Sequence, residues 1–76
     1  MIHVLHGFLG SPEDFNFLRS PQVILHDLYQ KSFEDIAREI SSQDTIIGYS
    51  MGGRVALQIA SQKQFRIQKL VLINAH

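Results

Sequence analysis

The stretch Thr45–Gly53, TIIGYSMGG, decides how the rest of this chain is interpreted. It contains a G-x-S-x-G pattern centred on Ser50. The residues before the pattern, 45–47, are β-branched and apolar, which predicts a buried strand, and residues 54–60 after it predict a helix. A serine on a sharp strand-to-helix turn has an exposed hydroxyl, so Ser50 is the candidate nucleophile of a catalytic site.

The same turn explains the glycines around the serine. It forces the serine backbone into a strained region, which persists only where the surrounding structure holds it. Strand and helix then pass so close that a side chain would clash two positions before and two positions after the serine. Those positions are Gly48 and Gly52, with Gly53 adjoining. We therefore expect Ser50 at the tip of the turn with strained backbone angles.

A second motif lies near the N-terminus, where Ile2–Leu5 predicts another buried strand that leads into His6-Gly7-Phe8. An oxyanion hole needs two backbone N–H groups aimed at one point. One comes from the residue after the nucleophile, here Met51, and the other from the loop after an earlier strand. We expect Phe8 N–H to be that second donor, with Gly7 letting the backbone turn inward. Taken alone, His6-Gly7 fits an ordinary strand exit equally well.

Composition limits the classes of function. Seventy-six residues make one small domain, and seven basic and seven acidic residues give zero net charge, so we expect neither nucleic acid nor a membrane as partner. There are no cysteines, and His3 and His6 would face opposite sides of a strand, so we expect no metal site and no cofactor. The apolar runs are strand-sized and no signal peptide is visible, which predicts a cytoplasmic protein.

Apolar runs alternate with amphipathic stretches along the chain. The N-terminal strand is followed by a helix opening at Ser11-Pro12, a strand at 22–26, a helix with capping-box spacing at Ser32–Asp35, the strand before Ser50, a helix ending at 62–64, and a strand at 69–73. This β-α-β-α-β-α-β order predicts an α/β fold: a three-layer, doubly wound parallel sheet with helices on both faces.

These motifs resemble a known superfamily. His6-Gly7-Phe8, then Asp27-Leu28 after a strand, then Gly48–Gly53 are similar to the first half of an α/β-hydrolase core, in which the turn is called the nucleophile elbow. The resemblance implies that residues 1–76 are the N-terminal part of such a domain, with cap and C-terminal half absent. It also implies the strand order 2-1-3-4, which brings the Phe8 loop beside Ser50.

More narrowly, His6–Ser11 together with Tyr49–Arg54 resembles the family of 2-succinyl-6-hydroxy-2,4-cyclohexadiene-1-carboxylate synthase, a lyase of menaquinone biosynthesis. The match implies Ser50 as the catalytic serine of a pyruvate elimination, with Tyr49 and Arg54 contacting a small carboxylate substrate. An arginine suits that role because its fork pairs a carboxylate with two hydrogen bonds. The alternatives are a solvated helix residue for Arg54 and a packing ring for Tyr49.

The catalytic aspartate and histidine of the family come from later strands, and this sequence ends at His76 before either. His3, His6, His26 and His76 are interpreted as structural or incidental rather than as a base for the serine. Two alternatives therefore stay beside the lyase: a carboxylesterase acting on small esters, and a silent fragment. We expect the 76-residue chain alone to be inactive and to self-associate through the exposed edge of the fourth strand.

Overall fold

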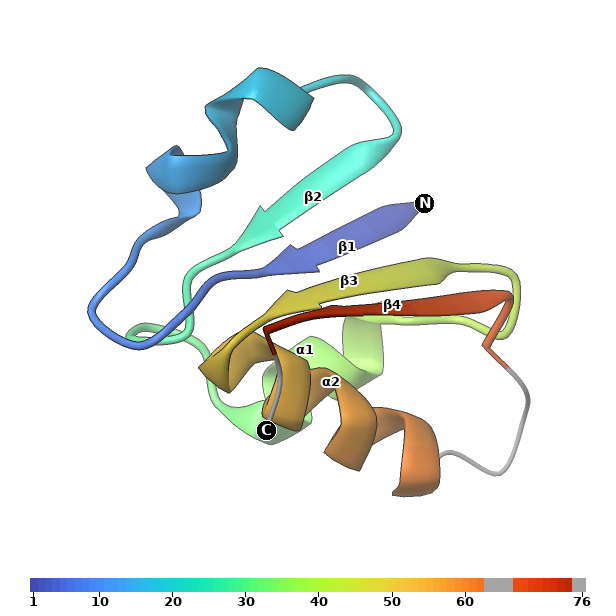
Figure 1. Cartoon of the computed structure of the whole chain (residues 1–76). Helices are drawn as coiled ribbons and strands as arrows, with labels where there is room; N and C mark the ends of the chain where they lie inside the picture. The colour runs from blue at the N-terminus through green and yellow to red at the C-terminus, as the bar shows by residue number, and fades with distance from the viewer. Residues whose placement is uncertain (63–66, 75–76) are drawn as a thin grey trace.

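The computed structural model of the chain describes residues 1–62 and 67–74. Its elements follow the order β1 (Ile2–Leu5), η1 (Pro12–Leu18), β2 (Val23–His26), α1 (Phe33–Glu39), β3 (Thr45–Tyr49), α2 (Met51–Gln62) and β4 (Lys69–Ile73). The strands form one parallel sheet in the order β2-β1-β3-β4, as the sequence predicts. Figure 1 shows α1 and α2 on one face of this sheet and η1 on the other, which gives the three expected layers.

The hydrophobic core lies between the sheet and the two α-helices. β1 contributes Leu5 and β3 contributes Ile46, and α1 with its cap contributes side chains spaced three and four positions apart. Its buried members are Leu5, Ile36, Ile40, Ile46, Ala56 and Ile59. The predicted capping box of α1 is confirmed, because the Ser32 hydroxyl accepts a hydrogen bond from Asp35 N–H at 3.1 Å.

Two helices differ from the sequence-based expectation. The segment after Ser11 is a 3₁₀ helix with a break at Phe15 (φ −113°, ψ 22°) rather than a regular helix. The third helix begins at Met51 instead of residue 54, because both glycines after the serine join its first turn. Its last described residue is Gln62, the first position of the predicted end at 62–64, and the other two positions lie outside the described residues.

The register of the sheet places two loops side by side. Leu5, the last residue of β1, lies opposite Gly48 of β3, so the chain leaves both strands at the same edge. The loop that begins with His6 and the turn at Ser50 therefore meet at the carboxyl ends of the strands. β2 lies on one side of β1 and β3 lies on the other, so the strand order reverses at β1. Open α/β sheets bind ligands at the carboxyl ends of the strands beside such a reversal.

Candidate active site

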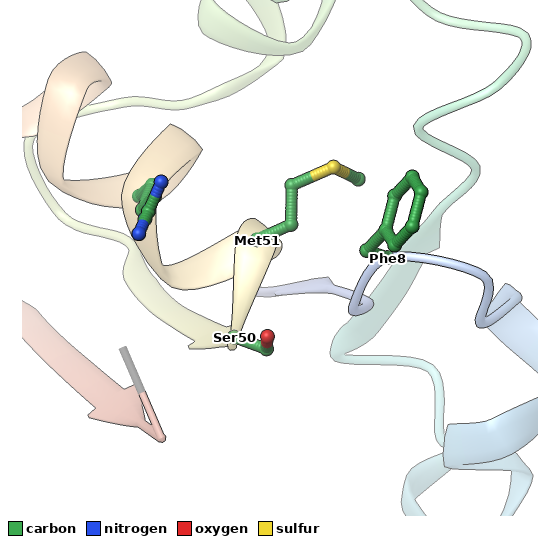
Figure 2. Close-up of a pocket in the computed structure, with 4 residues that line it drawn as sticks. Phe8, Ser50 and Met51 are labelled. Atoms are coloured by element: carbon green, nitrogen blue, oxygen red, sulfur yellow. The ribbon is translucent and has the colours of Figure 1, made fainter. Parts of the chain in front are cut away.

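Ser50 occupies the tip of the turn between β3 and α2, as Figure 2 shows. Its φ is 54°, in the left-handed region that a residue with a side chain adopts at a cost of about 1–2 kcal/mol. Hydrogen bonds hold it there from both sides. Ser50 N–H donates to the carbonyl of Ile73 on β4 at 2.8 Å, and Ser50 C=O accepts from Gly53 N–H at 2.9 Å as α2 starts. The predicted strained backbone is confirmed.

The glycines on either side of Ser50 are required by close approach. A Cβ built on Gly48 would lie 2.5 Å from the carbonyl oxygen of Gly52 and 2.6 Å from Gly53 Cα. A Cβ on Gly52 would overlap the carbonyl oxygens of Leu5 and His6 at the end of β1. The start of α2 is therefore pressed against both neighbouring strands, and side chains at these two positions would push it away.

Gly7 is also required by space rather than by its backbone angles, since none of the described glycines has a positive φ. A Cβ at Gly7 would lie 2.9 Å from the Tyr49 ring and 3.4 Å from Ser50 Cβ. The loop therefore passes directly against the turn. In the described residues, the left-handed conformation on this loop belongs to Leu9 (φ 64°), two positions later.

A pocket of about 300 Å³ opens beside the serine. Phe8, Ser50, Met51 and Arg54 line it, so four of the predicted site residues gather around one space. Figure 2 shows Phe8 on the loop facing Met51 at the helix start, with Ser50 at the turn below them. Met51 is the first residue of α2, and the first N–H groups of a helix have no partner within the helix.

Tyr49 lies outside that pocket. It lines a neighbouring pocket of about 400 Å³ together with the loop at residues 7–10, Asp14 and Phe15, and only Phe8 borders both spaces. The Tyr49 ring meets the Phe15 ring edge-on, with centroids 6.1 Å apart, and 37% of the residue is exposed. Tyr49 therefore forms a wall between η1 and the serine turn, while Arg54 borders the space above Ser50 directly.

The described histidines are all fully buried and have both ring nitrogens engaged. His6 bonds Gly7 C=O and Leu28 N–H, whereas His3 and His26 are linked to each other at 2.8 Å. None of these three is placed to accept a proton from Ser50. His76 lies outside the described residues. Sequence reasoning left the histidine partners undiscovered, although a histidine on each of two apolar strands signals a buried polar contact.

The linked histidines are the buried middle of a row of polar groups, and the ends of the row, the N-terminal ammonium and the Lys31–Glu39 pair, are partly exposed. His3 bonds Asp44 at 2.7 Å, and Asp44 also accepts from the N-terminal ammonium at 3.0 Å. Burial opposes the charge of Asp44, but hydrogen bonds from Ser41 N–H, His3 and the ammonium outweigh it and hold the pKa of that carboxyl well below its usual range. At the other end, Lys31 joins His26 to Glu39. These groups link β1, β2 and the end of α1, and the pocket beside Ser50 is lined by other residues.

The comparisons with known proteins agree with this geometry. The family model described as alpha/beta hydrolase fold matches residues 25–76, a span that holds the serine turn and both flanking glycines. No curated protein and no solved structure matches the chain. No helix among the described residues is long and apolar enough to cross a membrane. With more than half of its length matched, and with the strand order and serine turn described above, the chain belongs to the alpha/beta hydrolase fold family.

Proposed function

We propose that this protein is the nucleophile-bearing part of a serine-dependent enzyme, with Ser50 as the catalytic nucleophile and the N–H groups of Phe8 and Met51 as its oxyanion hole. One observation carries the proposal: Ser50 is held at φ 54° on a turn that opens directly into a pocket bordered by both donor residues. Strain of this kind persists at functional sites because the surrounding structure supports it.

The substrate that this pocket fits best is a small carboxylate. Arg54 stands at the start of α2, within one turn of Ser50, and borders the same pocket. A guanidinium beside the nucleophile would hold a carboxylate by two parallel hydrogen bonds. This supports an elimination of the type catalysed by 2-succinyl-6-hydroxy-2,4-cyclohexadiene-1-carboxylate synthases. Tyr49, on the adjoining wall, would contact the part of the substrate that extends past Phe8.

Serine chemistry needs a base, because the hydroxyl is a weak nucleophile by itself. The described residues supply none, since their three histidines are buried with both nitrogens occupied. We infer that turnover requires a histidine outside the described residues, whether His76 or one supplied by additional chain. Unless His76 supplies the base, residues 1–76 would bind a substrate at the oxyanion hole without turning it over.

The experiment is covalent labelling of Ser50 with a fluorophosphonate, followed by peptide mass spectrometry, with Ser50→Ala as the control. Labelling confined to Ser50 supports the proposal, and labelling that falls on another residue or survives in Ser50→Ala would contradict it. Arg54→Gln and Arg54→Lys then test the substrate class. Protection from labelling by succinate, a dicarboxylate probe, should be lost in Arg54→Gln. Protection by a neutral ester instead would favour the carboxylesterase.

A further inference from the structure

His6 is the first residue of the loop that carries Phe8, and its ring is completely buried. Its Nδ1 lies 2.8 Å from the carbonyl oxygen of Gly7, and its Nε2 accepts from Leu28 N–H at 2.9 Å. A carbonyl oxygen only accepts and a backbone N–H only donates. His6 must therefore be neutral, with its proton on Nδ1. Asp27 Oδ1, 3.9 Å from Nε2, is too far away to compete for that nitrogen.

The Gly7 carbonyl is held by a second donor, because Gly10 N–H reaches the same oxygen at 3.0 Å. The peptide between Gly7 and Phe8 is planar and trans, since the described residues include no cis peptide bond. In a trans peptide the C=O and the N–H point in opposite directions. Phe8 N–H therefore points away from the His6 ring, and no acceptor for it exists among the described residues.

We propose that His6 is a positioning residue for the oxyanion hole: its Nδ1–H anchors Gly7 C=O and so keeps Phe8 N–H directed toward the space beside Ser50. This inference rests on the proposed function of Ser50. If the peptide rotated, the buried Nδ1–H and Gly10 N–H would both lose their acceptor, and Phe8 N–H would face a donor. The buried ring thus fixes the donor before any substrate arrives, which is what an effective hole requires.

Two substitutions of His6 test its hydrogen bonds to Gly7 C=O and Leu28 N–H one at a time. The side-chain amide of His6→Asn places an N–H where Nδ1 stands, so it keeps the bond to Gly7 and loses the one to Leu28. His6→Gln reaches the position of Nε2 with its oxygen, so it keeps Leu28 and loses Gly7. The measurements are the residual dipolar coupling of Phe8 N–H, the rate of fluorophosphonate labelling at Ser50, and the midpoint of urea unfolding.

A positioning role predicts that His6→Asn retains the wild-type dipolar coupling of Phe8 and labels within about threefold of the wild-type rate, although it unfolds at lower urea. His6→Gln should change the coupling and label about 100-fold more slowly, as expected for removal of one hole donor. A merely structural role predicts that labelling follows the urea midpoint in both variants, and that result would overturn the inference. If the wild type labels at a residue other than Ser50, the proposed function fails. In that case, and also where the wild type does not label, the dipolar coupling of Phe8 in the two variants alone decides whether His6 positions the peptide.

Discussion

Acid should destabilise this fold in a pH range set by His26. The ring is fully buried, and burial, the Lys31 ammonium and His3 together lower the pKa of His26 from 6.5 to about 4, against the opposing charge of Glu39. The hydrogen bonds explain the direction. Asp44, a carboxylate, takes the Nε2 proton of His3, so His3 Nδ1 must accept from His26 Nε2–H. That leaves His26 Nδ1 as the acceptor for Lys31, and a second proton there would face an ammonium group.

The magnitude follows from linkage. A folded-state pKa below the unfolded value means that the native state binds fewer protons, so stability is fully present above pH 6.5 and is lost as the pH falls toward 4. The difference between the pKa of His26 in the unfolded chain, 6.5, and in the fold, about 4, corresponds to about 3 kcal/mol of stability, at about 1.4 kcal/mol for each pH unit. Between pH 7 and pH 5 the loss should be about 2 kcal/mol. Domains of this size are stable by only about 4–11 kcal/mol, so the effect is a large fraction of the total.

The assay is urea unfolding followed by circular dichroism at several pH values from 7 to 5, a range above that in which Asp44 and Glu39 titrate. The matched control is His26→Gln, whose amide still donates to His3 but does not titrate. Its free energy of unfolding should be lower than that of the wild type at pH 7, and the difference between the two proteins should shrink by about 2 kcal/mol by pH 5. The buried rings of His3 and His6 are present in both proteins, so their contribution to the pH dependence cancels in this difference. A wild-type curve that is flat over this range, or a difference between the two proteins that does not change with pH, would refute the reasoning.

Three further predictions concern the serine turn and the sheet. Gly52→Ala should lower the free energy of unfolding by about 3 kcal/mol or more, because the added Cβ would overlap the carbonyl oxygens of Leu5 and His6. The control in the same urea assay is Gln58→Ala on the exposed face of α2, which should change that free energy by less than about 0.5 kcal/mol. Ser50→Gly should be about 1 kcal/mol more stable than Ser50→Ala, since only the glycine adopts φ 54° without strain; equal midpoints would show that the angle stores no energy. Among the described residues β4 pairs only with β3, and its Leu72 is 40% exposed. The wild type should therefore self-associate through this edge in sedimentation equilibrium, and Leu72→Lys should weaken the association. A wild type that stays monomeric at millimolar concentration would contradict this prediction.

Local sequence determined the elements of this fold and the position of its serine turn. Each strand is a short apolar run, and α1 is capped by Ser32 and Asp35, which lie three residues apart. The patterns that specify these elements therefore lie within a few residues of one another in the sequence. The glycines around Ser50 were predictable for the same reason, because a tight turn constrains positions two residues away. The strand order followed from the family resemblance, and the structure confirms it.

Only the tertiary structure decided what the buried histidines do. His3 meets a partner 23 positions away and another 41 positions away, and His6 reaches Leu28 across 22 positions, so no local pattern indicates which atoms they contact. No local pattern indicates the places of Arg54 and Tyr49 either. Arg54 lines the same pocket as Ser50, whereas Tyr49 lines the neighbouring pocket. Both residues flank the serine in sequence, but Arg54 on α2 lines the pocket beside Ser50, whereas the Tyr49 ring contacts Phe15 of η1. Spacing along the chain identified Ser50 as the candidate nucleophile, whereas the packing of strands and helices around it selected its neighbours.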